Sequence, residues 1–428
     1  NAIVDDLSIP ALERAHELDK HSKKGAFKGP LHGVPITIKE NIDQKGYATP
    51  NGLESLKNLI APGNAPVVDN LEKDGAIVIG RTNTPEFSMR GTTDNVIHGR
   101  TYNPWNDRAS PGGSSGGASA AVMSGMGSLA HGNDIAGSLR IPSTATGACT
   151  VKPGLGRVPA FNPSQTQERG LVAQLMSVQG IIAREIKDVR LGMQSLINYD
   201  PRDPWMVEMP FESKSVTSPI KIGYTKETLG EVMHPAVDKA LENAIEALKD
   251  AGYILEEIVL PEFQDATNYS ARTLFGELKA LHEKDYKKLG SENFNLVADN
   301  YFQIISPFEG EDLLFGMAKR SYFFREWNLF FRKYPLVLTP FLLYPTYEWD
   351  RDIQGLEGTK EVLAGMFYAH TMNYMGIPAG VVSANYNDGL PVGVQIISSR
   401  FCEDIILKAC EEIEKRVGIM AEKLFARG

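Results

Sequence analysis

Ser110-Pro-Gly-Gly-Ser-Ser-Gly-Gly117 and, a little further along the chain, Asp134-Ile-Ala-Gly-Ser-Leu-Arg140 carry the most information in this sequence. The first stretch is mostly glycine and serine, and glycine lets backbone amides approach a ligand closely. The second places a serine behind a turn of small residues, whose N–H groups we expect to be free. Two serines on glycine-built loops indicate a nucleophile with a hydroxyl partner and an oxyanion pocket.

A pair of hydroxyl groups needs a base, and the candidate is Lys39 in Gly33-Val-Pro-Ile-Thr-Ile-Lys-Glu-Asn41. The apolar residues that lead up to Lys39 predict a buried strand. Burial disfavours the charged ammonium, so it lowers the pKa of a lysine and leaves the amine able to accept a proton. Successive side chains of a strand point to opposite faces, so we expect Glu40 to point away from Lys39.

Further segments show a pattern that resembles the amidase signature family of serine hydrolases, which cleave carboxamides. The family's central pattern, G-G-S-S-G-G and then D-x-G-G-S-[IL]-R-x-P, is matched at residues 112–117 and 134–142. The similarity extends from about residue 30 to beyond residue 390. Other matching segments are Gly80-Arg-Thr-Asn-Thr-Pro-Glu-Phe87, Thr92-Thr-Asp-Asn95, Asn103-Pro-Trp105, Val151-Lys-Pro153 and Gly389-Leu-Pro-Val-Gly-Val-Gln395.

The resemblance implies a catalytic triad of Ser138, Ser114 and Lys39. Ser138 takes the place of the family's nucleophile, Ser114 that of the bridging serine, and Lys39 that of the general base. The family holds its bridging serine behind a cis peptide bond, which here is Gly113–Ser114. The implied reaction forms an acyl-enzyme and releases a carboxylate and ammonia or an amine.

The resemblance also implies the surroundings of the triad. We expect the oxyanion pocket to consist of the backbone N–H groups of Ile135, Ala136, Gly137 and Ser138. The family usually has glycine where this chain has Ala136, and alanine is strained wherever a positive φ is needed. Asp134 and Arg140 are expected to orient the loop. The residues expected near the substrate are Phe87, Ser88, Met89, Thr93 and Gly113.

Alternation of short β-branched runs with longer amphipathic stretches predicts an α/β fold with a mixed sheet flanked by helices. Residues 66–74 have helical periodicity and residues 76–79 read as a strand; a second helix over 234–251 precedes a strand over 253–260. Residues 262–333 are mostly helical and aromatic, and we expect them to form a cap within one large domain that covers residues 1–428.

Bulk composition excludes several classes of function. The formal net charge of -9 and the absence of a basic run argue against nucleic-acid binding. No metal-ligand spacing or phosphate loop is present, so we expect neither a metal nor a cofactor. Prolines interrupt the most apolar stretch, so we expect no membrane span. The expected partner is therefore a small-molecule amide, together with a second copy of the chain, since relatives of this family are often dimers.

Three cysteines without ligand spacing fit a reducing compartment, and we expect a cytoplasmic protein. The chain begins at Asn1 and resembles the family only after the family's N-terminal helices. The expectation is therefore that those helices are missing, and a targeting segment upstream of Asn1 stays open.

Three alternatives remain open at this stage. Gly112-Gly-Ser-Ser-Gly116 also fits the nucleophile elbow of an α/β-hydrolase-like esterase, which needs a late histidine such as His370. The chain could also be the glutaminase (A) subunit of a tRNA-dependent amidotransferase, although Gly156-Arg-Val-Pro-Ala-Phe-Asn-Pro163 departs from the pattern of that subunit. A scaffold protein without activity is the third alternative, and the complete triad disfavours it.

Overall fold

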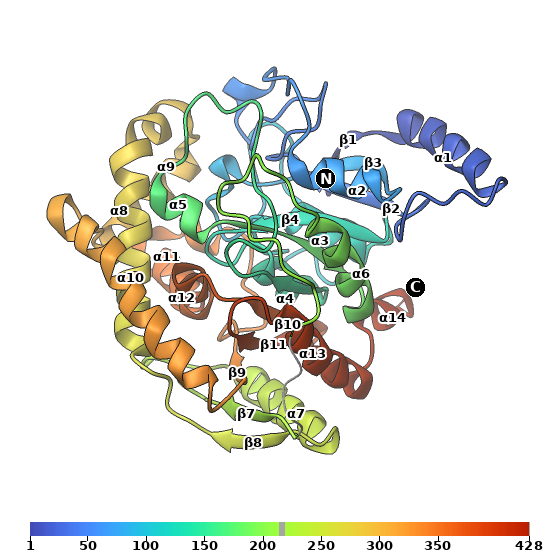
Figure 1. The fold of residues 1–428 in the computed structure, drawn as a ribbon. Coiled ribbons are helices and arrows are strands. Elements are labelled where there is room, and N and C mark those ends of the chain that lie inside the picture. Colours follow the sequence, from blue (N-terminus) through green and yellow to red (C-terminus); the bar gives the residue numbers. More distant parts are fainter. Residues whose placement is uncertain (214–218, 428) are drawn as a thin grey trace.

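An eleven-stranded sheet runs through the computed structural model, which describes residues 1–213 and 219–427. Helices cover this sheet on both sides (Figure 1). The strands are β1 (Ile3–Asp6), β2 (Pro35–Lys39), β3 (Ile77–Thr82), β4 (Leu129–Asp134), β5 (Cys149–Lys152), β6 (Val178–Ala183), β7 (Lys221–Tyr224), β8 (Ile254–Glu257), β9 (Leu336–Pro340), β10 (Ala379–Asn387) and β11 (Leu390–Ser398).

The α-helices differ widely in length, and the longest lie in the second half of the chain. They are α1 (Ser8–Ser22), α2 (Pro66–Lys73), α3 (Gly116–Met123), α4 (Arg140–Thr146), α5 (Leu171–Met176), α6 (Ile186–Leu196), α7 (Pro235–Asp250), α8 (Phe263–Leu289), α9 (Glu292–Ile305), α10 (Gly310–Phe331), α11 (Gly355–Ala364), α12 (Phe367–Met375), α13 (Glu403–Val417) and α14 (Met420–Phe425). Short 3-10 turns occur at Glu54–Leu56, Glu86–Ser88 and Arg351–Ile353.

The sheet is mixed, as the sequence predicted. Its strand order is β1-β3-β2-β4-β6-β5-β10-β11-β9-β7-β8. Strand β2 runs parallel to both of its neighbours, β3 and β4, whereas the strands from β4 through β6, β5, β10 and β11 to β9 alternate in direction. Because β2 and β4 are parallel neighbours, Lys39 and Asp134, the last residue of each strand, come to the same edge of the sheet.

The predicted helices over 66–74 and 234–251 correspond to α2 and α7, and the predicted strands that follow them correspond to β3 and β8. Residues 262–333 contain the helices α8, α9 and α10, which lie along one flank of the molecule (yellow to orange in Figure 1). Helix α8 contacts α9, α10 and α12, and α12 is the next helix inward. This helical region therefore packs beside the sheet rather than continuing it.

Two hydrophobic clusters fill the space between these layers. One lies between the sheet and helices such as α7 and α13, and the other joins β9 to the aromatic side chains of α8, α10 and α12. A glycine pair, Gly132 on β4 and Gly180 on β6, makes room for the side chain of Leu139, since an added Cβ would lie 2.9 and 2.6 Å from its methyl carbons. The residue after Ser138 thus packs directly on the sheet.

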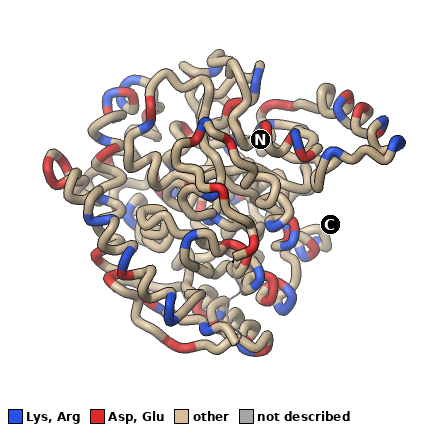
Figure 2. The backbone as a smooth tube through the Cα atoms, in the orientation of Figure 1, with Lys and Arg blue, Asp and Glu red and all other residues tan. Residues whose placement is uncertain are grey.

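Acidic and basic residues are interspersed over the molecule (Figure 2). Within the described part of the chain, no helix combines the length and the apolar character that crossing a membrane requires.

Candidate active site

Lys39 lies at the end of β2 with its side chain fully buried. Its Nζ atom is 2.7 Å from Ser114 Oγ, 2.8 Å from Asn133 Oδ1 and 3.1 Å from Ser115 Oγ. Burial lowers the pKa of Lys39 to about 7, although the negative charges of Asp134 and Glu40 oppose the shift. A large share of the molecules therefore carries a neutral amine at neutral pH.

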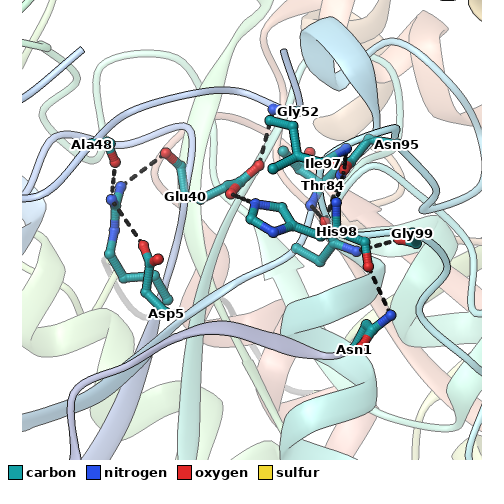
Figure 3. Close-up of polar contacts among 12 residues, drawn as sticks. Asn1, Asp5, Glu40, Ala48, Gly52, Thr84, Asn95, Ile97, His98 and Gly99 are labelled. Atoms are coloured by element: carbon teal, nitrogen blue, oxygen red, sulfur yellow. Dashed lines mark hydrogen bonds and ion pairs between the residues drawn. The ribbon is translucent and has the colours of Figure 1, made fainter. Parts of the chain in front are cut away.

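The side chain of Glu40 faces Gly52 and His98 (Figure 3), whereas that of Lys39 contacts Ser114, so the two point to opposite faces as the alternation along the strand predicted. Its carboxylate accepts a hydrogen bond of 2.9 Å from the backbone N–H of Gly52 and lies 3.0 Å from Nε2 of His98. The backbone carbonyl of Glu40 accepts a hydrogen bond from Arg81. The nearest acidic residue in the sequence is thus engaged on the side of the strand away from the two serines.

Ser114 lies in the glycine-rich loop that leads into α3, and the Gly113–Ser114 peptide bond is cis, as the resemblance implied. Thr93 holds this loop from behind: its hydroxyl donates to the carbonyl of Gly112 at 2.9 Å and accepts from the N–H of Gly116 at 3.1 Å. Thr93 is fully buried by this role. The expectation that Thr93 lies near the substrate is corrected accordingly, since its hydroxyl is engaged in the loop.

Ser138 follows β4 in the turn that precedes α4, and 9% of its surface is exposed. Its backbone carbonyl accepts a hydrogen bond of 3.2 Å from the N–H of Ser115, which ties the two serine-bearing loops together. Ser114 and Ser138 line the same cavity. The structure therefore brings Lys39, Ser114 and Ser138 to one place, with Lys39 inside and Ser138 toward the cavity.

Asp134 and Arg140 form a buried ion pair at the base of this turn. Arg140 Nε lies 3.0 Å from one carboxylate oxygen of Asp134 and Nη2 lies 3.1 Å from the other. Burial alone would raise the pKa of Asp134, but the charge and hydrogen bonds of Arg140 hold that pKa below its usual value. The same carboxylate accepts the N–H groups of Gly137 and Leu139 at 2.7 and 3.1 Å. The pair therefore fixes the backbone on both sides of Ser138.

Three of the four expected oxyanion donors remain available. The N–H groups of Ile135, Ala136 and Ser138 have no acceptor within residues 1–213 and 219–427, and all three residues line the cavity. The expectation that the N–H of Gly137 also serves as an oxyanion donor is corrected, because this N–H already donates to Asp134. The positive φ of this turn, +115°, also falls on Gly137, so Ala136 is accommodated without backbone strain.

The cavity in front of Ser138 has a volume of about 320 Å³. Phe87, Ser88, Met89 and Gly113 line it, at the positions expected near the substrate. The helical region contributes Phe275, Leu278, Tyr286 and Tyr301 to the wall, and the segment that includes α12 contributes Met366 and His370. A cavity of this size with a mostly apolar wall suits a small aromatic molecule.

The aromatic part of the wall is held by ring contacts. Phe87 has a positive φ of 54°, and its ring meets that of Tyr286 edge-on at 4.8 Å between centroids. Phe294, from α9, packs against both rings. The sequence does not single out Tyr286, because a helical aromatic side chain has the same spacing whether it faces a core or a cavity.

Asn133 is a second residue that sequence analysis missed. It accepts the hydrogen bond from Lys39 and donates one of 2.9 Å to Asn41 Oδ1. A signal was present in the sequence, because Asn133 precedes Asp134 on the strand that leads to the turn with Ser138. Both asparagines line the cavity, so Lys39 is joined to the cavity wall by side-chain hydrogen bonds.

The nucleophile elbow of an α/β-hydrolase requires a histidine beside its serine. Ser114 instead bonds to Lys39, and the ring of His370 is hydrogen-bonded to Ser270 on α8. The geometry does not favour this alternative.

Comparison with known proteins agrees with this geometry. The family model described as Amidase matches residues 1–407. The chain is 43% identical over 426 residues to the indoleacetamide hydrolase of Bradyrhizobium diazoefficiens, covering 99% of this chain and 81% of that protein. It is 29% identical to the (A) subunit of the glutamyl-tRNA(Gln) amidotransferase of Methanosarcina mazei, covering 96% and 89% of the two chains.

Solved structures show the same fold. A bacterial aryl acylamidase of the amidase signature family superposes with a TM-score of 0.81 at 24% identity, covering 99% of this chain and 90% of that one. A 6-aminohexanoate cyclic dimer hydrolase superposes with the same TM-score at 23% identity, covering 97% and 90%. With the family model matched over nearly the whole chain, the protein is an amide-hydrolysing enzyme and belongs to the amidase signature family.

Proposed function

We propose that this amidase hydrolyses the primary amide of an arylacetic acid, of which indole-3-acetamide is the type, through an acyl-enzyme on Ser138. The observation that carries the mechanism is the hydrogen bond of 2.7 Å between Lys39 and Ser114, made by a lysine whose burial lowers its pKa to about 7. A neutral amine at this position is a base for the serine that it contacts.

In the first half of the reaction, Lys39 takes the proton of Ser114 while Ser114 takes that of Ser138. The oxygen of Ser138 attacks the amide carbon, and the free N–H groups of Ile135 and Ala136 stabilise the resulting oxyanion. When the C–N bond breaks, the proton returns from Lys39 through Ser114 to the nitrogen, and ammonia leaves. The acyl group is then an ester of Ser138.

In the second half, a water molecule takes the place of ammonia. It gives a proton to the same relay and attacks the ester carbon, again through an oxyanion. The C–O bond to Ser138 breaks, the serine recovers its proton and the carboxylic acid is released. One water is consumed for each amide bond cleaved.

Two observations support an arylacetamide as substrate. The relative at 43% identity, which spans nearly the whole of this chain, is an indoleacetamide hydrolase. The cavity also presents aromatic side chains, Phe87, Phe275 and Tyr286, on the side contributed by the helices and the residues after β3. Flat aromatic rings pack favourably edge-on or offset against such side chains.

The test is ammonia release by the purified chain from indole-3-acetamide, phenylacetamide and glutamine, with Ser138→Ala as control. We expect turnover of the two arylacetamides and none by the variant, whose thermal unfolding should match that of the wild type. A fluorophosphonate should add its mass to Ser138 in the wild type only. Turnover of glutamine but of neither arylacetamide would overturn the proposal and favour a glutaminase.

The proposal further places the enzyme in the cytoplasm as a homodimer. Free thiols at Cys149, Cys402 and Cys410 support a reducing compartment, and the frequent dimers of the family support the second copy. Light scattering on the purified protein measures its mass in solution; a mass of one chain would contradict the dimer.

A further inference from the structure

His370 is a wall residue of the cavity that the proposed reaction does not use. It lies on α12, and its ring Nδ1 is hydrogen-bonded to the hydroxyl of Ser270 on α8. Next to this contact, Thr267 on α8 and Thr371 on α12 also join the two helices, with their hydroxyl oxygens 3.0 Å apart. The imidazole ring is thus held in place from one side.

The hydrogen bonds of Ser270 favour one tautomer of the His370 ring. The single hydroxyl proton of Ser270 is donated to the carbonyl of Thr267 at 3.0 Å. With this hydroxyl donating to Thr267, the oxygen of Ser270 is the acceptor for Nδ1–H of His370. Burial, assisted by the positive charge of Arg140, lowers the pKa of His370 to about 4, so the ring is neutral at neutral pH. In a neutral imidazole with Nδ1 protonated, Nε2 is a hydrogen-bond acceptor.

Nε2 of His370 is not fully enclosed by the protein. None of the described residues makes a hydrogen bond with this nitrogen, and it is not among the enclosed polar atoms that lack a partner. His370 itself lines the cavity together with Ser138. A lone pair that no described side chain or backbone group satisfies is therefore available at the wall of the cavity that contains Ser138.

This nitrogen also has a fixed position relative to the nucleophile. Arg140, two residues after Ser138, donates a hydrogen bond of 2.9 Å to the carbonyl of Ala369, the residue before His370. On the next turn of α12, Asn373 accepts from Arg140 and donates to the carbonyl of Asp134 at 3.1 Å. Hydrogen bonds therefore join helix α12 to both ends of the turn that carries Ser138.

We propose that His370 is a specificity-determining residue, whose Nε2 accepts a hydrogen bond from a ring N–H of the substrate's acyl group. The enzyme then selects an arylacetamide with an N–H in its ring, such as an indole, over a ring of the same shape without one. The inference rests on the proposed function and deepens it. A polar group that stays unpaired when the wrong substrate binds is an effective source of discrimination.

The experiment compares indole-3-acetamide with 1-benzothiophene-3-acetamide, in which sulfur replaces the ring N–H and the bicyclic shape is kept. For the wild type we expect kcat/KM to be about 10- to 100-fold higher with the indole. In His370→Phe the ratio should fall to about 1, because the indole loses its acceptor while the benzothiophene keeps its packing.

Three further variants sharpen the test. His370→Gln offers an amide oxygen as acceptor and should restore part of the preference. Ser270→Ala removes the acceptor that fixes the proton on Nδ1, so the preference should fall without the ring being lost. His16→Phe makes the same exchange at an exposed position of α1 and should leave the ratio unchanged.

A wild-type ratio near 1 would overturn the inference without any variant having to fold. Equal loss on both substrates in His370→Phe, with the ratio kept, would also overturn it and indicate a structural role. Failure of the proposed function has a different signature: neither arylacetamide is hydrolysed although the fluorophosphonate still labels Ser138. That result would remove the substrate class and this inference with it.

Discussion

Nζ of Lys39 lies 2.7 Å from Oγ of Ser114, although 75 residues separate them in the sequence. The end of β2 supplies the lysine and the loop before α3 supplies the serine. With Asn133 Oδ1 at 2.8 Å, the amine has polar neighbours but no carboxylate within hydrogen-bond distance in the described residues. Its charge state is therefore governed mainly by burial, and several predictions depend on that state.

The first prediction concerns the pH dependence of the reaction. Only neutral Lys39 accepts a proton, and burial lowers its pKa to about 7. We expect kcat/KM to fall about tenfold for each pH unit below 7 and to level off above it. Assays with an uncharged amide between pH 5 and 9 measure this profile. A profile that is flat between pH 5 and 7 would contradict the role of Lys39.

The second prediction concerns stability. An unfolded lysine has a pKa of 10.5 and the folded Lys39 one of about 7, so between these values the unfolded chain binds the extra proton. The stability of the wild type should thus rise with pH across this window. The free-energy cost of burying Lys39 as a neutral amine is fully present below pH 7. Lys39→Met should raise the free energy of unfolding at pH 7 by at most about 5 kcal/mol, because it removes this cost. The loss of the hydrogen bonds that Lys39 makes offsets part of the gain.

Urea unfolding at pH 7 and pH 10 measures this effect. The advantage of Lys39→Met over the wild type should shrink as the pH rises, while its turnover is lost at both. Parallel stability curves for the two proteins between these pH values would show that Lys39 is not buried in its neutral form.

The third prediction concerns the ion pair below the nucleophile turn. Asp134→Asn leaves the buried guanidinium of Arg140 without its counter-charge and weakens the acceptors for Gly137 and Leu139. We expect a loss of about 3–5 kcal/mol in the free energy of unfolding. Activity should fall as well, because the turn that carries Ser138 loosens.

Asp69 supplies the matched control. It forms an ion pair of 2.8 Å with Arg202, but both side chains are substantially exposed. Asp69→Asn should cost no more than about 1 kcal/mol. Denaturant unfolding of both variants gives the comparison; similar losses would refute the orienting role of Asp134.

The fourth prediction separates two neighbouring small residues. An added Cβ at Gly137 would lie 2.7 Å from Ala369 Cβ and from Ile141 Cδ1, at a φ of +115°. Gly137→Ala should therefore lower the free energy of unfolding by about 1–3 kcal/mol or more. It should also remove most of the activity. Ala136→Gly, the glycine more usual in this family, should keep both. Thermal unfolding and amide turnover test the pair, and an active Gly137→Ala enzyme would contradict this close packing.

Ser114 and Ser138 could be singled out in the sequence because they lie in short segments rich in glycine and other small residues, and Lys39 because an apolar run leads up to it. The strand leading to Lys39, the cis bond before Ser114 and the helices of residues 262–333 are found in the structure. The wall of the cavity could not be predicted in the same way. Tyr286 and His370 lie on helices whose apolar spacing is the same for a core and for a binding surface.

The backbone N–H groups of residues 135–138 show a different limit of prediction from sequence. The resemblance assigns four N–H groups of one turn to the oxyanion pocket, and only the three-dimensional structure shows that the N–H of Gly137 donates to Asp134. Thr93 likewise lies in a segment that approaches the substrate in relatives, yet its hydroxyl is used by Gly112 and Gly116. Side-chain partners of a turn depend on contacts that spacing along the chain does not encode.

The separate origins of the cavity's two sides have a practical consequence. Lys39, Ser114 and Ser138 belong to the sheet edge and its loops, whereas Phe275, Tyr286 and His370 belong to helices that follow β8. Substitutions on those helices should therefore change which amides are accepted, and so which acids are released. Lys39, Ser114 and Ser138 would stay unchanged. A library of variants with substitutions confined to α8, α9 and α12 would show which other amides the enzyme can hydrolyse.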